Sequence, residues 1–443
     1  MKNAAALLAL LLVCSLPAMT LAAAEPAGGG PASDTVPEES LTTNAIDHDG
    51  QPATDWGRLG QPVSVTVSDT TGQGVAEADE TTNRLVLEGD VRSGYVDVSP
   101  DLGATLITQD DAIRIDHDRY AIDETLGSGP SDERQAALED AYNRTLGTID
   151  ELEEREQEAV SQHAEGTLSE EELLIVLVRN QEKAAALSES LDHLESAADR
   201  TAGISITARD HQASLDQYQG PVRSQLDMSA RGDPAENILL ETSATGVSLA
   251  MVTDGEYVRE TTRFDNQEST QSAEIASHGD AEERVSTYYP WAVTEQPVGQ
   301  GLGVSTIVDY SQAQLYWLEV RTVQGSLQLY LDTGSGEVFR EVQSLSVDEL
   351  PSTAQEQSWT DGTLEASVNR TPVNGPMEIT AISTETDEPV DARVLVDGRV
   401  LGHTDGDDAV WLLPPADEFE LSVQSAEGRV NESVSGWSAT VNG

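Results

Sequence analysis

The stretch SEEELLIVLVRNQEKAAALSESLDHLESAA, residues 169–198, decides the centre of the fold because its apolar residues follow a helical period. The series alternates strictly between steps of four and three residues: Leu173, Leu177, Asn180, Ala184, Leu187, Leu191, Leu194, Ala198. Such a series is the seam of a coiled coil. Ser169 and Glu172 have the spacing of a capping box, which predicts that the helix begins there.

A second amphipathic helix precedes this one, over about 132–163. Its apolar residues also recur mostly at steps of three and four: Leu138, Tyr142, Leu146, Ile149, Leu152, Ala159. Gly166 and Thr167 supply a short turn, so we predict an antiparallel helical hairpin over 131–200 whose stripes pack together. Asn180 is either a buried amide that fixes the register or an exposed residue at the edge of the seam.

Strand patterns flank the helices on both sides. Short alternating runs at 63–67, 85–87, 95–98 and 112–115, separated by glycines, predict a β-rich unit over 56–126. After the helices, a hairpin turning at Asp254-Gly255 and strands at 315–323, 326–331 and 337–342 predict a mixed α+β unit over 237–346. The run LQLYLDTGSGEVFREV, residues 327–342, resembles the closing hairpin of PepSY-type domains.

The C-terminal part is predicted as a linker over 347–372, with Pro351 and Pro372, followed by a β-sandwich over 373–437. Two motifs, Pro-Val-Asp-Ala-Arg-Val at 389–394 and Gly-His-Thr-Asp at 402–405, resemble the carboxypeptidase-regulatory, transthyretin-like β-sandwich. Asp408 departs from that family's pattern, which has glycine there. The resemblance implies a non-catalytic accessory module. The predicted fold class is therefore α+β and multidomain: a β-rich unit, a helical hairpin, a mixed α+β unit and a β-sandwich.

The N-terminus has the pattern of a secretory signal peptide. Lys2 precedes an apolar run over 4–16, Pro17 follows it, and three alanines over 22–24 suit a signal peptidase. We predict a signal peptide over 1–24, cleaved after Ala24, and a flexible spacer over 25–55 that is rich in glycine and proline. An uncleaved membrane anchor and lipid attachment at Cys14 are the alternatives.

Composition indicates a salt-rich environment. The formal net charge is −56, and Cys14 is the only cysteine, so the mature chain forms no disulfide and has no thiol nucleophile. At molar salt the screening length falls to about 3 Å, which removes most of the self-repulsion of such a chain. The apolar content of 38% argues for folded domains rather than a disordered acidic chain. The whole chain resembles the uncharacterised multidomain exported proteins of haloarchaea.

Three kinds of candidate site have competing interpretations. Asp332-Thr333-Gly334-Ser335 is the tetrad of an aspartic protease, but a hairpin turn explains the same residues. Acidic clusters at 47–50, 116–118 and 405–408 are either calcium loops or solvated turns. The seven histidines have no metal-ligand spacing, and His163 and His193, on the helical hairpin, are predicted to be solvated.

We therefore predict no catalytic residue, no cofactor and no metal site. Asn143, Asn369 and Asn431 head glycosylation sequons, and Asn369 is favoured because it lies in the predicted linker.

The favoured function is that of a non-enzymatic, secreted or cell-surface protein that binds envelope or extracellular proteins or glycans. A polyanion does not attract nucleic acid or an anionic membrane, and we predict no membrane insertion after signal cleavage. A regulator or accessory of an exported peptidase, suggested by the PepSY-type hairpin, is the first alternative. An unrecognised hydrolase, which needs paired carboxylates in a cleft, is the second.

Overall fold

The computed structural model describes residues 63–65, 85–96, 102–233, 237–268, 273–293, 301–352, 357–372, 375–404 and 409–436. All of them belong to one compact unit, Trp56–Gly443. The predicted signal peptide, the spacer and the acidic clusters at 47–50 and 405–408 lie outside the described residues.

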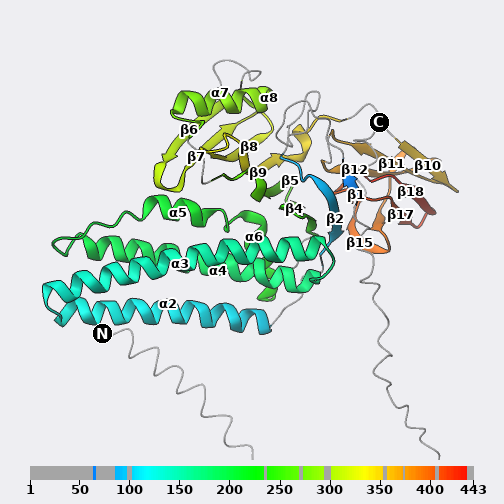
Figure 1. The fold of residues 1–443 in the computed structure, drawn as a ribbon. Helices are drawn as coiled ribbons and strands as arrows, with labels where there is room; N and C mark the ends of the chain where they lie inside the picture. Colours follow the sequence, from blue (N-terminus) through cyan, green and yellow to red (C-terminus); the bar gives the residue numbers. More distant parts are fainter. Residues whose placement is uncertain are drawn as a thin grey trace, which may run out of the picture. The chain divides into compact units, whose positions relative to one another are not determined.

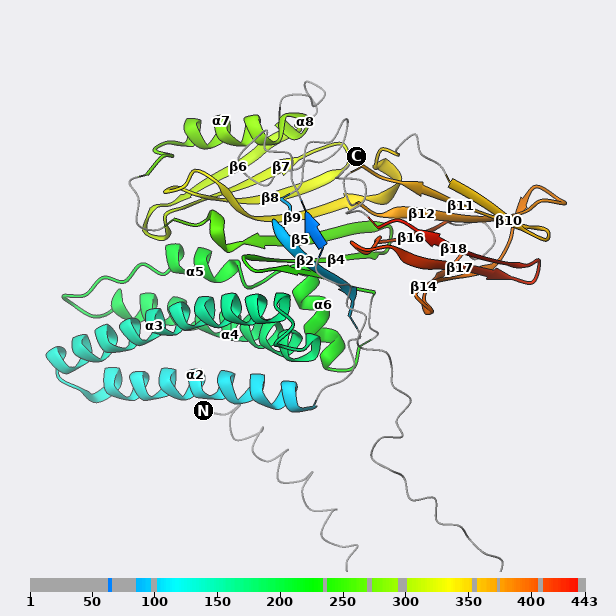
Figure 2. The same ribbon diagram turned by 45° about the vertical axis from the view of Figure 1, so that its right-hand side comes forward.

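Three long helices form one layer (Figures 1 and 2): α2 (Leu102–Ser128), α3 (Ser131–Ala164) and α4 (Glu170–Ala198). The predicted capping box is confirmed, since the Ser169 hydroxyl accepts from the Glu172 amide at 3.3 Å and the Glu172 carboxylate accepts from the Ser169 amide at 3.0 Å. Asn180 is fully buried in the seam, where its amide donates to the Leu152 carbonyl. The interpretation as a buried seam amide is therefore the correct one.

Helix α2 replaces a predicted strand. Residues 112–115 read as an alternating strand, yet they lie within Leu102–Ser128, and Ile113 is exposed. The sheltered residues of α2, such as Ile115, Ile122 and Leu126, follow the steps of a helix instead. Arg179 of α4 binds Asp111 of α2 through two hydrogen bonds of 2.5 and 3.1 Å, which fastens the third helix to the hairpin.

A nine-stranded antiparallel sheet lies against this layer, in the order β1-β2-β3-β4-β5-β9-β8-β7-β6. Its strands are β1 (Val63–Val65), β2 (Gly89–Tyr95), β3 (Leu239–Ser243), β4 (Gly246–Thr253), β5 (Glu256–Arg263), β6 (Gly303–Tyr310), β7 (Leu315–Arg321), β8 (Gly325–Asp332) and β9 (Val338–Ser346). Strand β2 pairs with β3, so the segment before the helices and the segment after them share one sheet. The β-rich and α+β units were predicted separately, and their strands are joined.

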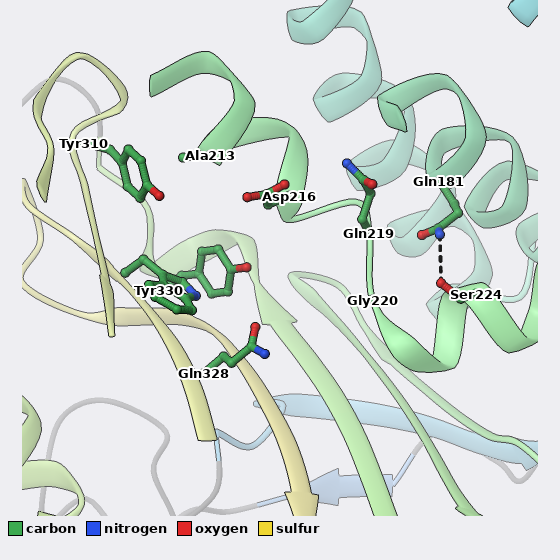
Figure 3. Close-up of a pocket in the computed structure, with 10 residues that line it drawn as sticks. Gln181, Ala213, Asp216, Gln219, Gly220, Ser224, Tyr310, Gln328 and Tyr330 are labelled. Carbon is green, nitrogen blue, oxygen red and sulfur yellow. Dashed lines mark hydrogen bonds between the residues drawn. The ribbon is translucent and has the colours of Figure 1, made fainter. Parts of the chain in front are cut away.

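One face of the sheet packs against helices. Helices α5 (Arg209–Asp216) and α6 (Pro221–Ala230) connect the helical layer to β3. Apolar residues of α3, α4 and α6, among them Val160, Leu177 and Leu226, meet Leu240 and Leu249 of the sheet in one buried cluster. Towards the β6 edge the two layers leave a pocket between them (Figure 3).

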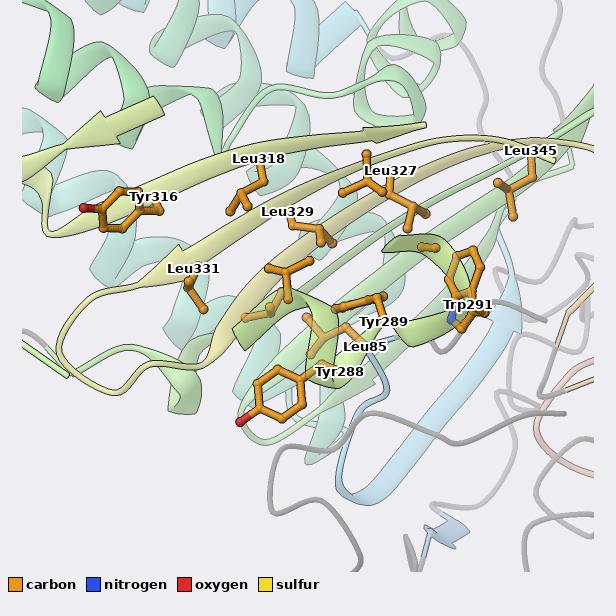
Figure 4. Close-up of a cluster of buried hydrophobic side chains, with 14 of the residues drawn as sticks. Leu85, Tyr288, Tyr289, Trp291, Tyr316, Leu318, Leu327, Leu329, Leu331 and Leu345 are labelled. Carbon is orange, nitrogen blue, oxygen red and sulfur yellow. The ribbon is translucent and has the colours of Figure 1, made fainter. Parts of the chain in front are cut away.

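The opposite face has its own core (Figure 4), covered by α7 (His278–Tyr288) and the short α8 (Pro290–Val293). Tyr289 and Trp291 pack there against leucines that alternate along the strands, such as Leu327 and Leu329 of β8. The Ser277 hydroxyl accepts from the Asp280 amide and caps α7.

The C-terminal β-sandwich consists of two antiparallel sheets over a shared core. Their strands are β10 (Gln357–Asp361), β11 (Leu364–Arg370), β12 (Met377–Ser383), β13 (Glu388–Pro389), β14 (Ala392–Val396), β15 (Arg399–His403), β16 (Val410–Leu412), β17 (Phe419–Ser425) and β18 (Arg429–Val434). Residues 357–370 were predicted as part of a linker, and they form β10 and β11. Leu364, Ala366 and Val368 alternate into the core with no exposed surface, which makes this hairpin part of the domain.

Candidate functional site

The candidate site is the pocket between the helical layer and the sheet, here called the interlayer pocket. Its volume is about 460 Å³, and its wall comes from α4, α5 and α6 on one side and β6, β7 and β8 on the other. Volumes of ~300–1,000 Å³ are typical of small-molecule sites. Figure 3 shows side chains of Tyr310, Tyr330, Gln328 and Asp216 pointing into the same space.

Strand geometry places the aromatic residues of the pocket. Gln328 and Tyr330 lie two residues apart on β8 and so share a face of the sheet. Trp317 of β7 is the direct partner of Tyr330, which brings both rings to the same place. Tyr310, at the end of β6, closes this side of the wall.

Two arginines stabilise the tyrosines. The Arg340 guanidinium lies 5.7 Å from the Tyr330 ring centre, and that of Arg209 lies 5.1 Å from the Tyr310 ring centre. Burial raises the pKa of Tyr330 although Arg340 opposes the shift, so its phenol stays protonated at neutral pH. Trp317 and Tyr310 are half-buried and offer accessible ring surface.

Three primary amides line the pocket: Gln181 of α4 and Gln219 before α6 on the helical side, and Gln328 of β8 beside the aromatic rings. The Gln181 Nε2 donates to the Ser224 hydroxyl at 3.0 Å. The buried Gln181 Oε1 has no hydrogen-bond partner among the described residues. A buried acceptor without a donor costs free energy, and a ligand hydroxyl in the pocket would supply that donor.

Asp216, at the end of α5, is the one carboxylate among the described residues that line the pocket. The residue is exposed at the mouth, yet neighbouring protein atoms remove part of its hydration and raise its pKa. Arg340 opposes this shift. The site therefore has one carboxylate acceptor, whose pKa lies above its ordinary value.

A buried ion-pair network lies next to the pocket and joins α3, α6, β5 and β9. Arg223 binds Glu156 through hydrogen bonds of 2.6 and 3.0 Å, and Arg340 binds Glu260 at 3.3 Å. Arg223 also lies 3.6 Å from Glu260, and all four side chains are at most 2% exposed. Burial opposes the charge on Arg223, but the two carboxylates raise its pKa above the usual value.

Glu260 also fixes the start of helix α6. Its Oε1 accepts from the backbone amides of Val222 at 2.6 Å and Arg223 at 3.3 Å, the position in which a negative charge stabilises a helix N-terminus. Arg340 donates to the Gln219 carbonyl at 2.7 Å. The pocket segment 219–224 is thereby tied to strands β5 and β9.

The opposite face of the sheet contains a second buried polar cluster, around Glu341. Its carboxylate accepts from the Tyr289 hydroxyl at 2.6 Å and from the Leu85 amide at 3.1 Å. Burial raises the pKa of Glu341 although these donors oppose the shift. Arg259 donates to the Leu85 carbonyl at 3.0 Å. This cluster fastens the segment before β2 onto the sheet.

The tetrad at 332–335 forms the turn between β8 and β9. The Asp332 Oδ1 accepts from the Ser335 amide at 2.7 Å and from the Glu268 amide at 3.3 Å. Gly336 has a φ of 71°, in the left-handed region that favours glycine. The Ser335 contact and the Gly336 conformation are those of a hairpin turn, and the Glu268 contact joins this turn to the segment that follows β5.

The prediction that His163 is solvated is wrong. His163 is 1% exposed, and its Nδ1 lies 2.8 Å from the Thr242 hydroxyl, because the end of α3 rests on β3 rather than in solvent. His193 is partly exposed and lies 2.9 Å from Asp123 of α2. No group of three or more metal-binding side chains occurs in the described part of the chain. The cluster at 116–118 lies on the exposed side of α2.

The sequons lie in three different settings. Asn369, expected in a linker, is half-buried in β11 and donates to Glu378 at 3.3 Å. Asn143 is exposed on α3, but the Thr145 hydroxyl is buried and donates to a carbonyl within the helix. Asn431 and Ser433 are both exposed on β18. On accessibility, the structure therefore favours Asn431 over Asn369 as the glycosylation site.

The pocket residues were not singled out in the sequence, because they come from six elements between 181 and 330. One signal was present. The predicted hairpin already puts Trp317, Gln328 and Tyr330 on one face, but its turn at 324–325 would pair Trp317 with Asp332. In the structure Arg321 pairs with Ser326, which brings Trp317 opposite Tyr330. The helical side of the pocket has no comparable local signal.

The fold and the pocket define a multidomain α+β protein with a C-terminal β-sandwich and a small-molecule-sized site between two layers. The domain of unknown function DUF7096 matches residues 1–235, more than half of the chain, and the chain belongs to this family. A family of unknown function, DUF7094, matches residues 238–351, and an archaeal fibronectin-III type-like domain matches 355–432. No curated protein and no solved structure matches the chain.

These matches give an archaeal multidomain protein with a C-terminal β-sandwich, and they confirm neither of the two finer resemblances. The C-terminal sandwich matches the archaeal fibronectin-III type-like family, and neither a PepSY-type nor a transthyretin-like family is among the matches. The boundary near residue 236 separates α6 from β3, so both families contribute strands to one sheet. The interlayer pocket likewise takes its helical wall from the first family and its strands from the second.

Proposed function

We propose that this chain is an exported, halophilic archaeal protein of the cell envelope or the extracellular space that binds proteins or glycans and is not an enzyme. The interlayer pocket carries the binding role, because aromatic rings and primary amides converge there on a space of about 460 Å³. The archaeal fibronectin-III type-like domain at 355–432 supports a modular protein built for interaction.

The proposed location rests on the signal-peptide pattern of residues 1–24 and on the net charge of −56. Within the described residues, none of the helices has both the length and the apolar character that a membrane crossing requires.

The lining of the pocket supports binding over hydrolysis. Glycoside hydrolysis commonly uses a pair of carboxylates on either side of the scissile bond. Among the described lining residues Asp216 is the one carboxylate, and Glu260, behind Gly220, is occupied by two backbone amides and Arg340. The peptidase-accessory alternative rested on the PepSY-type resemblance, which the family matches do not include.

The test is affinity capture of a C-terminally tagged copy from cross-linked cells and medium, kept at molar salt, with mass spectrometry of the captured material. Recovery with envelope proteins or glycoconjugates, above an untagged control, is the expected result. Recovery only with cytoplasmic proteins would contradict the proposed location. Recovery with one exported peptidase whose activity changes would replace the proposal by the accessory role.

A further inference from the structure

We infer that the interlayer pocket binds a neutral sugar ring of a glycan; this inference rests on the proposed binding function and specifies its ligand. A sugar ring has an apolar face of C–H groups and an edge of hydroxyls that both donate and accept hydrogen bonds. The pocket has a counterpart for each of these surfaces.

The aromatic wall suits the apolar face. Trp317 and Tyr330 are neighbours across strands β7 and β8, and Tyr310 lies at the adjoining end of β6. Such rings bury large areas at a low cost in conformational entropy, because each has only two rotatable side-chain bonds. Tyr330 is further held by Arg340 and by an edge contact with Phe339 at 6.1 Å. The wall is thus formed before a ligand arrives.

The polar wall suits the hydroxyls. A primary amide offers donors and an acceptor in one plane, and a carboxylate offers acceptors. Gln181, Gln219 and Gln328 supply amides, and Asp216 supplies the carboxylate. The Gln181 Oε1 is buried and has no hydrogen-bond partner among the described residues, so a small rotation of this amide towards the pocket would let it accept from a ligand hydroxyl.

The charges around the pocket disfavour an anionic ligand. The guanidinium of Arg340 is directed to Glu260, to the Gln219 carbonyl and to the Thr262 hydroxyl, so its charge is compensated within the protein. Asp216 and the net charge of −56 repel anions. The described lining residues include no cation, and the exposed Arg209 lies against the Tyr310 ring, 5.1 Å from its centre.

A quaternary ammonium ion is the competing ligand, since aromatic rings and a carboxylate also attract cations. Its methyl groups form no ordinary hydrogen bonds, so it would leave the amides of Gln219 and Gln328 and the Gln181 Oε1 without a ligand partner. The amide content of the wall therefore favours a hydroxyl-rich ligand.

The experiment uses the full chain in molar potassium chloride and three kinds of probe. The methyl glycosides of glucose, galactose and mannose are neutral, tetramethylammonium is the cation, and glucuronate is the anion. Binding is measured by calorimetry and by saturation transfer from protein to ligand in NMR. Trp317→Ala removes an aromatic ring of the pocket, and Gln328→Ala removes one of its amides. Trp359→Ala, at a half-buried tryptophan of β10, is the matched control.

We expect at least one neutral glycoside to bind, and its affinity to fall at least about tenfold in Trp317→Ala and Gln328→Ala but to stay unchanged in Trp359→Ala. Absence of glycoside binding, tighter binding of tetramethylammonium or glucuronate, or equal affinities in Trp317→Ala and Trp359→Ala would each overturn the inference. The affinity capture separates the two claims. Envelope partners retained by Trp317→Ala, together with no glycoside binding, would remove the sugar site and the binding role of the pocket, and would leave an envelope protein that binds its partners through another surface.

Discussion

Gly220 shows how a single residue determines the geometry of the pocket. A Cβ at this position would overlap the carboxylate of Glu260. That carboxylate cannot move freely, because it accepts from the Val222 and Arg223 amides and pairs with Arg340. The absence of a side chain at 220 therefore allows β5 to cap α6.

We predict that Gly220→Ala lowers the free energy of unfolding by about 1–3 kcal/mol, the usual cost of overpacking a core. Gly147, which is exposed within α3 and has open space where a Cβ would lie, is the matched control. There, Gly147→Ala should stabilise the protein by about 0.5–1 kcal/mol, because alanine restricts the unfolded chain and favours the helix. Urea unfolding at fixed salt measures both changes. Equal effects of the two substitutions would contradict the proposed overlap.

His163 gives a residue-scale prediction of pH dependence. Its burial, and secondarily the charge of Arg92, lower its pKa from 6.5 to about 4. Between these two pH values the His163 imidazole binds more protons in the unfolded state than in the folded state. The contribution of His163 to the free energy of unfolding is therefore complete above pH 6.5 and is lost as the pH decreases towards 4. The loss attributable to this group is about 3 kcal/mol, since one pKa unit corresponds to about 1.4 kcal/mol.

The measurement is the free energy of unfolding from pH 7.5 to 4.5 in the natural chain and in His163→Asn. Asparagine keeps a polar atom near Thr242 and does not titrate, so it removes the histidine contribution and leaves that of the carboxylates. We expect the variant to lose less stability over this range. Parallel curves for the two proteins would show that His163 is not the responsible group.

At the scale of elements, the ion-pair network between α3, α6, β5 and β9 makes the layers depend on one another. Glu156 and Arg223 form the tightest pair, with an N–O distance of 2.6 Å, and both are nearly inaccessible to solvent. Removal of one partner leaves a buried charge without compensation, which costs about 3–5 kcal/mol. Replacement of both by apolar residues removes that penalty.

We therefore predict that Glu156→Leu and Arg223→Met each destabilise the protein strongly, and that the double variant is more stable than either. A double-mutant cycle from urea unfolding gives the coupling energy. Glu260 and Arg340 stay paired in the double variant, so the cap of α6 is preserved. Additive effects of the two substitutions would mean that the pair does not act as a unit.

The same scale shows what the sequence could predict. Helices α3 and α4, the cap at Ser169 and the hairpin of β8 and β9 followed from local periodicity, because each is stabilised by contacts close in the chain. Residues 112–115 alternate between apolar and polar over four positions, which is typical of a strand. The helical spacing becomes visible only in the longer series that continues from Ile115 through Ile122 to Leu126. Residues 357–370 were assigned to a linker because they lie between Pro351 and Pro372 in a polar stretch, although Leu364, Ala366 and Val368 alternate with polar residues as in a half-buried strand. The pocket depends on the meeting of distant elements, for which local patterns contain little information.

At the scale of the whole molecule, strand β2 links the sheet to the C-terminal domain. The Tyr95 hydroxyl donates to the Leu413 carbonyl and accepts from its amide at 3.0 Å. Arg399 of β15 donates to the carbonyls of Tyr95 and Val96 at 3.1 and 2.8 Å. Burial raises the pKa of Tyr95 well above its ordinary value, so the hydroxyl keeps its proton.

We predict that Tyr95→Phe costs about 1–3 kcal/mol, because the buried polar groups of Leu413 lose their partner. Hydrogen exchange should show faster exchange of the Leu413 amide, with little change in α3 and α4. Tyr120→Phe, at a tyrosine that is 70% exposed on α2, is the control and should change neither quantity. Unchanged protection of Leu413 in Tyr95→Phe would contradict the role of this contact.

The net charge of −56 gives the last prediction, which concerns the chain as a whole. The screening length is about 10 Å at 0.1 M salt and about 3 Å at 1 M, so repulsion among the surface carboxylates acts over many neighbours at low salt and over few at high salt. We expect potassium chloride to raise the unfolding temperature by at least about 10 °C over this range, which for a chain of this size corresponds to a few kcal/mol or more.

Salt also strengthens apolar burial, and sucrose at matched water activity measures that effect without screening. A variant with Asp118→Asn, Asp140→Asn and Glu283→Gln, all at exposed positions, should unfold at a higher temperature in low salt and respond less to potassium chloride. A flat response to salt, or an equal response to sucrose, would show that charge repulsion does not limit the stability of this fold.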